Sequence, residues 1–124
     1  MDKNYLELVI EKEYVPAFKY IMNVVCSQTS CRIIFNTSND DKKKYNIKLF
    51  SQDENKNSRF KAEIQEDKLR YFTCDVPKVD IMVSSDLLLE RLRKIRANDA
   101  IIIYMKNTKD QLFIYNLDDN NNHY

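Results

Sequence analysis

The sequence of 124 residues contains no glycine and no tryptophan, and it has two prolines and one histidine. Without glycine, turns that need a positive φ must be built mainly by the many Asn and Asp residues. The same absence excludes glycine-rich phosphate loops and the glycine-flanked nucleophile of hydrolases. His123 lies in a polar C-terminal stretch, where we do not expect it to act as a base or a ligand. We therefore expect no enzyme, no metal site and no cofactor.

Long apolar runs and a strong net charge are also missing. No stretch approaches the about 20 apolar residues of a membrane span, and the acidic N-terminal segment is unlike a signal peptide. The net charge of +1 excludes a general polycation, so any electrostatic role must be local. The odd number of cysteines and the lack of paired metal spacing predict reduced thiols. We expect an intracellular protein without a membrane partner, whose thiols are Cys26, Cys31 and Cys74.

The remaining composition favours one packed domain. Apolar residues make up 44% of the chain and aromatic residues 11%, which is typical of a globular core rather than disorder. Short runs rich in apolar residues, most of them alternating with polar ones, predict strands at 5–10, 31–37, 45–50, 59–65, 69–83, 100–105 and 111–117. The strand at 69–83 is interrupted near Pro77, which cannot donate to a central ladder.

Two segments change to a helical period. In the first, which begins near Glu13, one stripe collects Val15, Phe18, Met22 and Val25. The second follows the capping residues 84–86 and ends at 97–99. Its core stripe comprises Leu88, Leu92 and Ile95, which we expect to pack against strands that contain Ile47, Leu49, Phe60 and Ile64.

The order β-α-β-β-β-β-α-β-β predicts an α+β domain, in which an antiparallel sheet carries both helices on one face. The second helix places four cations in six positions, with Arg93 and Lys94 opposite the core stripe and Arg91 and Arg96 at its edges. Such a cluster is either a solvated helix face or a local patch for a polyanion.

Specific segments resemble the sliding clamp family, proliferating cell nuclear antigen (PCNA) and its relatives. "LFSQD" at 49–53 followed by "RYFTCD" at 70–75 is similar to the "LQSMD…TYRCD" pattern of eukaryotic PCNA. The segment "VSSDLLLERLRKIRANDAIII" at 83–103 is similar to that family's cap residues, amphipathic helix, acidic turn and strand. The likeness covers roughly residues 4–117. It implies a single PCNA-like N-terminal clamp domain at 1–119, with 120–124 a frayed tail or the start of a missing strand or linker.

The resemblance implies a function. The chain would be a subunit or piece of a DNA sliding clamp, a polymerase processivity factor that encircles duplex DNA non-specifically in replication and repair. Both helices would face the phosphates, and the DNA-binding candidates are Arg91, Arg93, Lys94, Arg96, Lys12 and Lys19. Arg93 falls where the family typically places a lysine, whereas Glu90 occupies a position that is usually basic. We therefore expect weak DNA contact from this domain alone.

The resemblance also implies partners and a location. Besides double-stranded DNA, they are a replicative polymerase, a clamp loader, and other clamp subunits or a second clamp domain, at a nuclear or viral replication site. Clamp subunits contain two such domains and this chain has room for one, so it is either a piece of a longer protein or a single-domain relative. The alternative is a clamp-fold protein–protein adaptor, similar to checkpoint clamps or viral processivity factors, that does not itself encircle DNA.

Overall fold

The computed structural model describes residues 4–37, 45–55, 57–96, 98–106 and 111–118. Within these ranges the chain forms eight strands, two α-helices and two short 3₁₀ turns. The strands are β1 (Leu6–Ile10), β2 (Ser30–Asn36), β3 (Asn46–Gln52), β4 (Lys61–Gln65), β5 (Leu69–Cys74), β6 (Lys78–Ser84), β7 (Ala100–Met105) and β8 (Phe113–Leu117). The helical elements are η1 (Lys12–Tyr14), α1 (Val15–Val25), η2 (Glu66–Lys68) and α2 (Ser85–Arg93). The expected tail at 120–124 and the polar linker at 38–44 lie outside the described residues.

The predicted α+β class is confirmed, and every strand pair is antiparallel. The described strands form two four-stranded sheets, in the orders β5-β1-β7-β8 and β4-β3-β2-β6, where the sequence predicted one sheet. The segment expected as one interrupted strand is two strands, β5 and β6, that belong to different sheets. The chain therefore passes from the first sheet to the second at the predicted interruption near Pro77.

Hydrogen bonds fix this change of sheet. The Asp75 amide donates to the Tyr5 carbonyl at 3.0 Å, which ties the end of β5 to the start of the first sheet. The Thr37 amide donates to the Pro77 carbonyl at 2.9 Å, and the Thr37 hydroxyl donates to the Val76 carbonyl at 2.9 Å. Because Pro77 has no N–H, its backbone can form hydrogen bonds to the second sheet only through its carbonyl. The three residues between β5 and β6 thus link both sheets.

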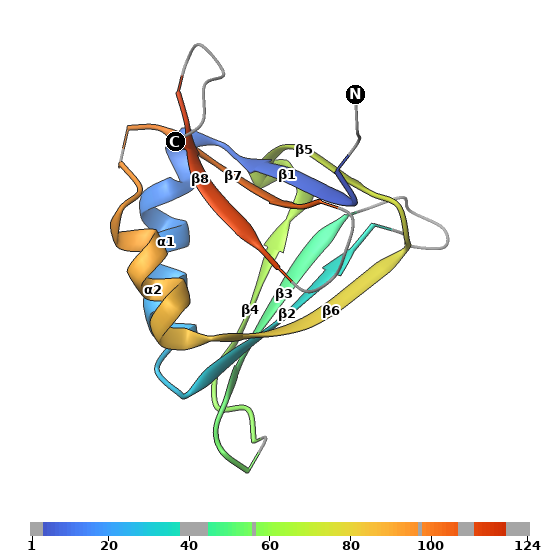
Figure 1. Ribbon diagram of the computed structural model, residues 1–124. Helices are drawn as coiled ribbons and strands as arrows, with labels where there is room; N and C mark the ends of the chain where they lie inside the picture. The colour runs from blue at the N-terminus through green and yellow to red at the C-terminus, as the bar shows by residue number, and fades with distance from the viewer. Residues whose placement is uncertain (1–3, 38–44, 56, 97, 107–110, 119–124) are drawn as a thin grey trace.

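One core fills the space between the two sheets and the helices. It includes residues of both sheets, such as Leu8, Phe35 and Ile101, and the predicted stripe of α1, which is Val15, Phe18, Met22 and Val25. Figure 1 shows α1 and α2 side by side along one side of the molecule, where they contact each other. The helix α1 also contacts β3 and β4, and α2 contacts β2 and β6. The prediction that both helices share one side is confirmed.

The core prediction for α2 is correct except at one position. Leu88, Leu92 and Ile95 are buried, as are the strand residues Ile47, Leu49 and Ile64. Phe60 is 44% exposed, so its predicted burial is wrong. It precedes β4, and its backbone exchanges hydrogen bonds with Ser51: the Ser51 amide donates to the Phe60 carbonyl, and the Phe60 amide donates to the Ser51 hydroxyl. This pairing places Phe60 at the end of the hairpin, beyond the packed part of the strand.

Asparagine and aspartate build a turn that glycine often builds in other proteins. Between β3 and β4, Asp53 Oδ1 accepts hydrogen bonds from the Asn55 amide at 2.9 Å and the Asn57 amide at 2.8 Å. The Asp53 amide donates to the Asn57 carbonyl at 3.1 Å. A side-chain carboxylate thus satisfies backbone donors in the loop, in line with the expectation that Asn and Asp build the turns.

Candidate nucleic-acid interface

The second helix begins where its capping residues predicted and ends earlier than expected. The Ser84 hydroxyl accepts from the Leu87 amide at 3.4 Å, which identifies Ser84 as the N-cap. The helix ends at Arg93 instead of 97–99. Beyond it, the Lys94 amide donates to the Arg91 carbonyl and the Ile95 amide to the Leu92 carbonyl, each three residues back. The turn tightens there, so Lys94 and Arg96 follow the helix rather than belonging to it.

Lys19 stabilises this helix end. Its Nζ donates to the Ile95 carbonyl at 2.5 Å and so joins α1 to the turn that follows α2. Carbonyls at a helix C-terminus carry partial negative charge and lack helical partners, which favours an ammonium group there. Lys19 is half-buried and contributes to the packing of the two helices. The Lys19 ammonium therefore joins the two helices, and its role in DNA binding stays a prediction.

Arg91 points to the first sheet. Its Nε donates to the Ile114 carbonyl on β8 at 2.5 Å, and its guanidinium carbon lies 4.3 Å from the centre of the Tyr115 ring. Residues two apart on a helix do not face the same way, so Arg91 and Arg93 lie on different sides of α2. The structure therefore separates Arg91 from the cations with which the sequence grouped it.

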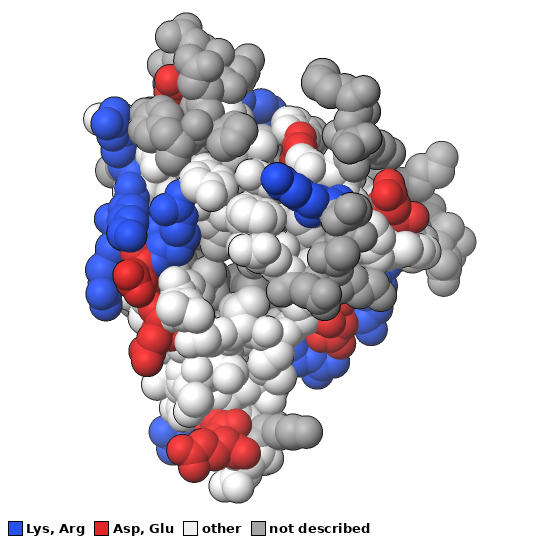
Figure 2. All heavy atoms as spheres, in the orientation of Figure 1, with Lys and Arg blue, Asp and Glu red and all other residues white. Residues whose placement is uncertain are grey.

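Four of the six predicted side chains are exposed on the helices or beside them: Lys12, Arg93, Lys94 and Arg96. Figure 2 shows Lys and Arg gathered along the left edge of the molecule, where Figure 1 places the helices. An open hollow of about 290 Å³ between α1 and α2 is lined by Lys19, Asn23, Leu89, Leu92 and Arg93. We call the exposed surface of η1, α1, α2 and residues 94–96 the helix layer.

Acidic side chains reduce the positive charge of the helix layer. Glu13, Asp86 and Glu90 are exposed on the same elements as the cations. Glu90 lies three and four residues before Arg93 and Lys94, a spacing at which helical side chains are neighbours. The excess of positive charge is therefore small and concentrated at the end of α2. The expected weak DNA contact from one domain stays a prediction.

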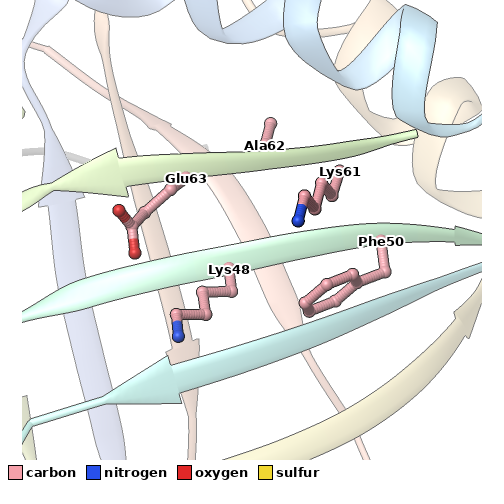
Figure 3. A pocket seen from close by; sticks show the side chains of 5 residues that line it. All are labelled: Lys48, Phe50, Lys61, Ala62 and Glu63. Atoms are coloured by element: carbon pink, nitrogen blue, oxygen red, sulfur yellow. The ribbon is translucent and has the colours of Figure 1, made fainter.

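A second basic surface, which the sequence analysis missed, lies on the outer face of β3 and β4. Figure 3 shows Lys48, Phe50, Lys61 and Glu63 on one side of these strands and Ala62 on the other, and the hollow that they line has a volume of about 410 Å³. The strand register pairs Lys48 with Glu63 and Phe50 with Lys61. Strand alternation in the sequence could have placed these residues on one face, but the pairing of β3 with β4 sets their register. The pairing of Lys48 with Glu63 offsets part of the charge.

The described part of the chain was also compared with the requirements of a metal site and of a membrane span. There, no group of three or more His, Cys, Asp and Glu side chains is placed to hold a metal ion. The helices in the same part are too short and too polar to cross a membrane. The three cysteines are free thiols, with Cys26 and Cys31 buried and Cys74 half-buried. The helix layer therefore remains the candidate site, because it carries the exposed residues that the sequence predicted for DNA binding.

Comparison with known proteins gives a partial similarity to a viral sliding clamp. No family model matches the chain. It is 33% identical over 76 residues to a probable DNA polymerase sliding clamp of Acanthamoeba polyphaga mimivirus. That alignment covers 60% of this chain and 16% of the clamp, so the chain spans a small part of that relative.

A second relative matches nearly end to end. Uncharacterized protein L52 of the same virus is 44% identical over 127 residues, which cover 98% of this chain and 87% of L52. Because the alignment covers 98% of the chain, it includes every described strand and helix. The chain belongs to the same family as mimivirus protein L52.

Proposed function

We propose that the chain is a sliding-clamp-type domain that binds duplex DNA without sequence preference through the helix layer. The observation that carries the proposal is the pair of adjacent helices on one side of two antiparallel sheets, with Arg93 and Lys94 exposed at the end of α2, in a chain similar to a probable viral clamp. Exposed cations on a rigid layer attract phosphates regardless of base sequence.

The proposed role is binding and not catalysis. In a complete clamp, this domain would act with further clamp domains or subunits to encircle DNA and increase the processivity of a replicative polymerase, after assembly by a clamp loader. The identified relatives are mimivirus proteins, so we propose the site of viral DNA replication as its place of action. Repair synthesis would use the same surface, because the contact does not depend on sequence.

The test removes the exposed cations at the end of α2. Arg93→Ala with Lys94→Ala should weaken binding to fluorescent duplexes of different sequence by about the same factor for each. The double variant should also flatten the dependence of log K on log salt by about two units at most. The matched control is Lys48→Ala with Lys61→Ala, which removes the same charge from the outer face of β3 and β4.

The comparison of the two double variants separates the possible roles. Loss of affinity and slope with the helix-layer variant alone supports the proposal. Equal loss with both variants would mean that general charge, and not the helix layer, attracts DNA. If the affinity and the salt slope stay unchanged in the helix-layer variant, the cations form a solvated face. The adaptor function, in which the clamp fold does not contact DNA, would then replace the proposal.

A further inference from the structure

A groove with a mixed polar and apolar lining separates the edges of the two sheets. The edge strands β8 of the first sheet and β6 of the second border an open hollow of about 490 Å³. Its described lining includes Met82, Leu87, Arg91, Phe113, Ile114 and Tyr115. Figure 2 shows this face as a largely uncharged surface that is hollowed near its centre. We call this feature the β6–β8 groove.

Large apolar side chains are exposed on one side of this groove. Met82 on β6 is 50% exposed, and Leu87 in the first turn of α2 is 68% exposed. On the other side, the rings of Phe113 and Tyr115 are stacked with their centres 6.4 Å apart. Burial of these apolar side chains would be favourable, so a partner that covers them would form a more stable complex. Exposed apolar residues that gather along one hollow are typical of a binding surface.

The backbone of β8 is available on the groove side. Among the described strands, β7 pairs with one edge of β8 and no strand pairs with the other. The Ile114 carbonyl accepts the Arg91 Nε on that second edge. Because backbone groups alternate along a strand, Leu112 and Asn116 direct theirs to the same edge as Ile114. Such an edge is a template for one more strand, and Arg91 covers its centre in this structure.

The charge of the groove indicates the chemistry of its partner. Arg91 is the only charged side chain in the described lining. One cation in apolar surroundings suits a peptide carboxylate better than the closely spaced phosphates of DNA. A second copy of the chain that paired through β8 would bring the two Arg91 guanidinium groups near each other, which like-charge repulsion disfavours. The groove therefore fits a foreign segment that is extended, apolar on one face and acidic at one position.

We propose that the β6–β8 groove binds an extended peptide segment of another protein, which adds to β8 as a strand. Its apolar side chains would pack against Met82 and Leu87, and one Asp or Glu would meet Arg91. The Arg91 guanidinium would exchange its bond to the Ile114 carbonyl for the carboxylate, and a peptide N–H would take its place at that carbonyl. No buried donor or acceptor is left without a partner by this exchange.

Selection from a peptide library tests the proposal with the full chain immobilised. The wild type should enrich peptides in which apolar residues alternate with others and one position is Asp or Glu. Leu87→Glu should weaken binding of a selected peptide by about tenfold or more, as for the central residues of other interfaces. The matched control is Tyr20→Glu, because Tyr20 on α1 is 67% exposed, lies outside the groove lining and introduces the same charge. It should change the affinity less than about twofold.

A charge reversal tests the role of Arg91. Selection on Arg91→Glu should enrich Lys or Arg at the position that is acidic for the wild type. Circular dichroism melting checks that this variant folds, and Met82→Glu replaces it as the second groove variant if it does not. Enrichment of no peptide by the wild type would overturn the proposal, as would equal effects of Leu87→Glu and Tyr20→Glu.

The oligomeric state provides the remaining alternative. Sedimentation of the wild type at micromolar concentration should show a monomer if the groove is reserved for a foreign segment. A dimer that Leu87→Glu dissociates and Tyr20→Glu does not would overturn the proposal, since the groove would then be an interface between copies of the chain. Neither result depends on DNA binding, so failure here and failure of the clamp function can be told apart.

Discussion

At the scale of single residues, the two-pronged ion pair between Arg32 and Asp80 joins β2 to β6 on the outer face of the second sheet. Arg32 Nε donates to Asp80 Oδ1 at 2.9 Å, and a terminal nitrogen donates to the other oxygen. The hydrogen bond from Arg32 lowers the pKa of Asp80, although partial desolvation opposes the shift. Arg32 also lies over the Phe50 ring, with 5.9 Å between the guanidinium carbon and the ring centre. The pair therefore connects three strands.

The Arg32–Asp80 pair makes stability depend on pH. Because the pKa of Asp80 is lower in the folded chain, its contribution is complete above the unfolded pKa of about 3.9 and disappears as the pH falls through the folded value. Arg32→Met, which keeps the apolar stem, should lower the urea midpoint near pH 6. The difference from wild type should disappear near the acid limit of folding. Arg59→Met removes an exposed arginine and is the control; the same pH-dependent loss there would contradict an effect specific to the pair.

The cysteines differ in environment as well as in exposure. The neighbouring Cys31 thiol lowers the pKa of Cys26, although burial opposes this shift, whereas Cys26 and burial both raise the pKa of Cys31. Cys26 is 6% exposed and Cys31 is 0% exposed, whereas Cys74 is half-buried at the end of β5. Access and thiolate formation thus favour different thiols.

We expect access to decide the order of alkylation. Treatment of the native protein with iodoacetamide should label Cys74 first, since a buried thiol reacts only after local opening. Mass spectrometry of peptides should show one label under native conditions and three in denaturant. Cys74→Ser should abolish the early label. Labelling of Cys26 at the rate of Cys74 would instead mean that the lowered pKa outweighs burial and that the α1–β2 turn opens readily.

At the scale of elements, local sequence patterns predicted the features that depend on nearby residues. They did not predict the features that depend on distant contacts. The stripes of both helices and the cap at Ser84 could be read from the sequence, because helical period and capping depend on residues a few positions apart. The early end of α2 could not be predicted in this way. The turn that follows it is also held by a contact between distant residues, since Lys19 Nζ donates to the Ile95 carbonyl across 76 positions of sequence. A contact of that range is set by how the two helices pack, and no local pattern encodes it.

A buried and an exposed leucine on α2 provide a matched test of the helix orientation. Leu92 is 3% exposed and belongs to the core, whereas Leu87 is 68% exposed. Leu92→Ala should lower the free energy of unfolding by about 2–5 kcal/mol, as for other buried leucines. Leu87→Ala should change it by less than about 0.5 kcal/mol, since surface substitutions have small effects. Urea denaturation measures both; similar losses in the two variants would mean that the orientation of α2 is wrong.

At the scale of the whole molecule, the α+β class followed from the order of the elements, but the division into two sheets did not. Strand alternation tells which side chains share a face and does not tell which strands pair. Thus β1 pairs with β5 and β7, which lie far away in the chain. In the candidate site, the cations at the end of α2 were correctly predicted to face solvent. The contact of Arg91 with β8 was not predicted, because it depends on how the first sheet packs beside α2.

The charge balance of the helix layer gives a prediction for the molecule as a DNA-binding surface. Glu90 is exposed on α2 three residues before Arg93, a spacing at which helical side chains are neighbours, so its charge should offset part of the attraction between the cations and DNA phosphates. Glu90→Lys changes this local charge by two units. It should strengthen binding about equally for duplexes of any sequence and steepen the dependence of log K on log salt by about two units at most.

The position of the added charge decides the meaning of that result. Glu63→Lys makes the same change on the outer face of β4, where Glu63 lies opposite Lys48 in the sheet. Anisotropy titrations at several salt concentrations should show a gain for Glu90→Lys and a much smaller gain for Glu63→Lys, because screening limits the reach of a surface charge to about 10 Å at 0.1 M salt. Equal gains would mean that DNA responds to the net charge of +1 rather than to the helix layer. An unchanged affinity for Glu90→Lys would mean that the helices do not face phosphate.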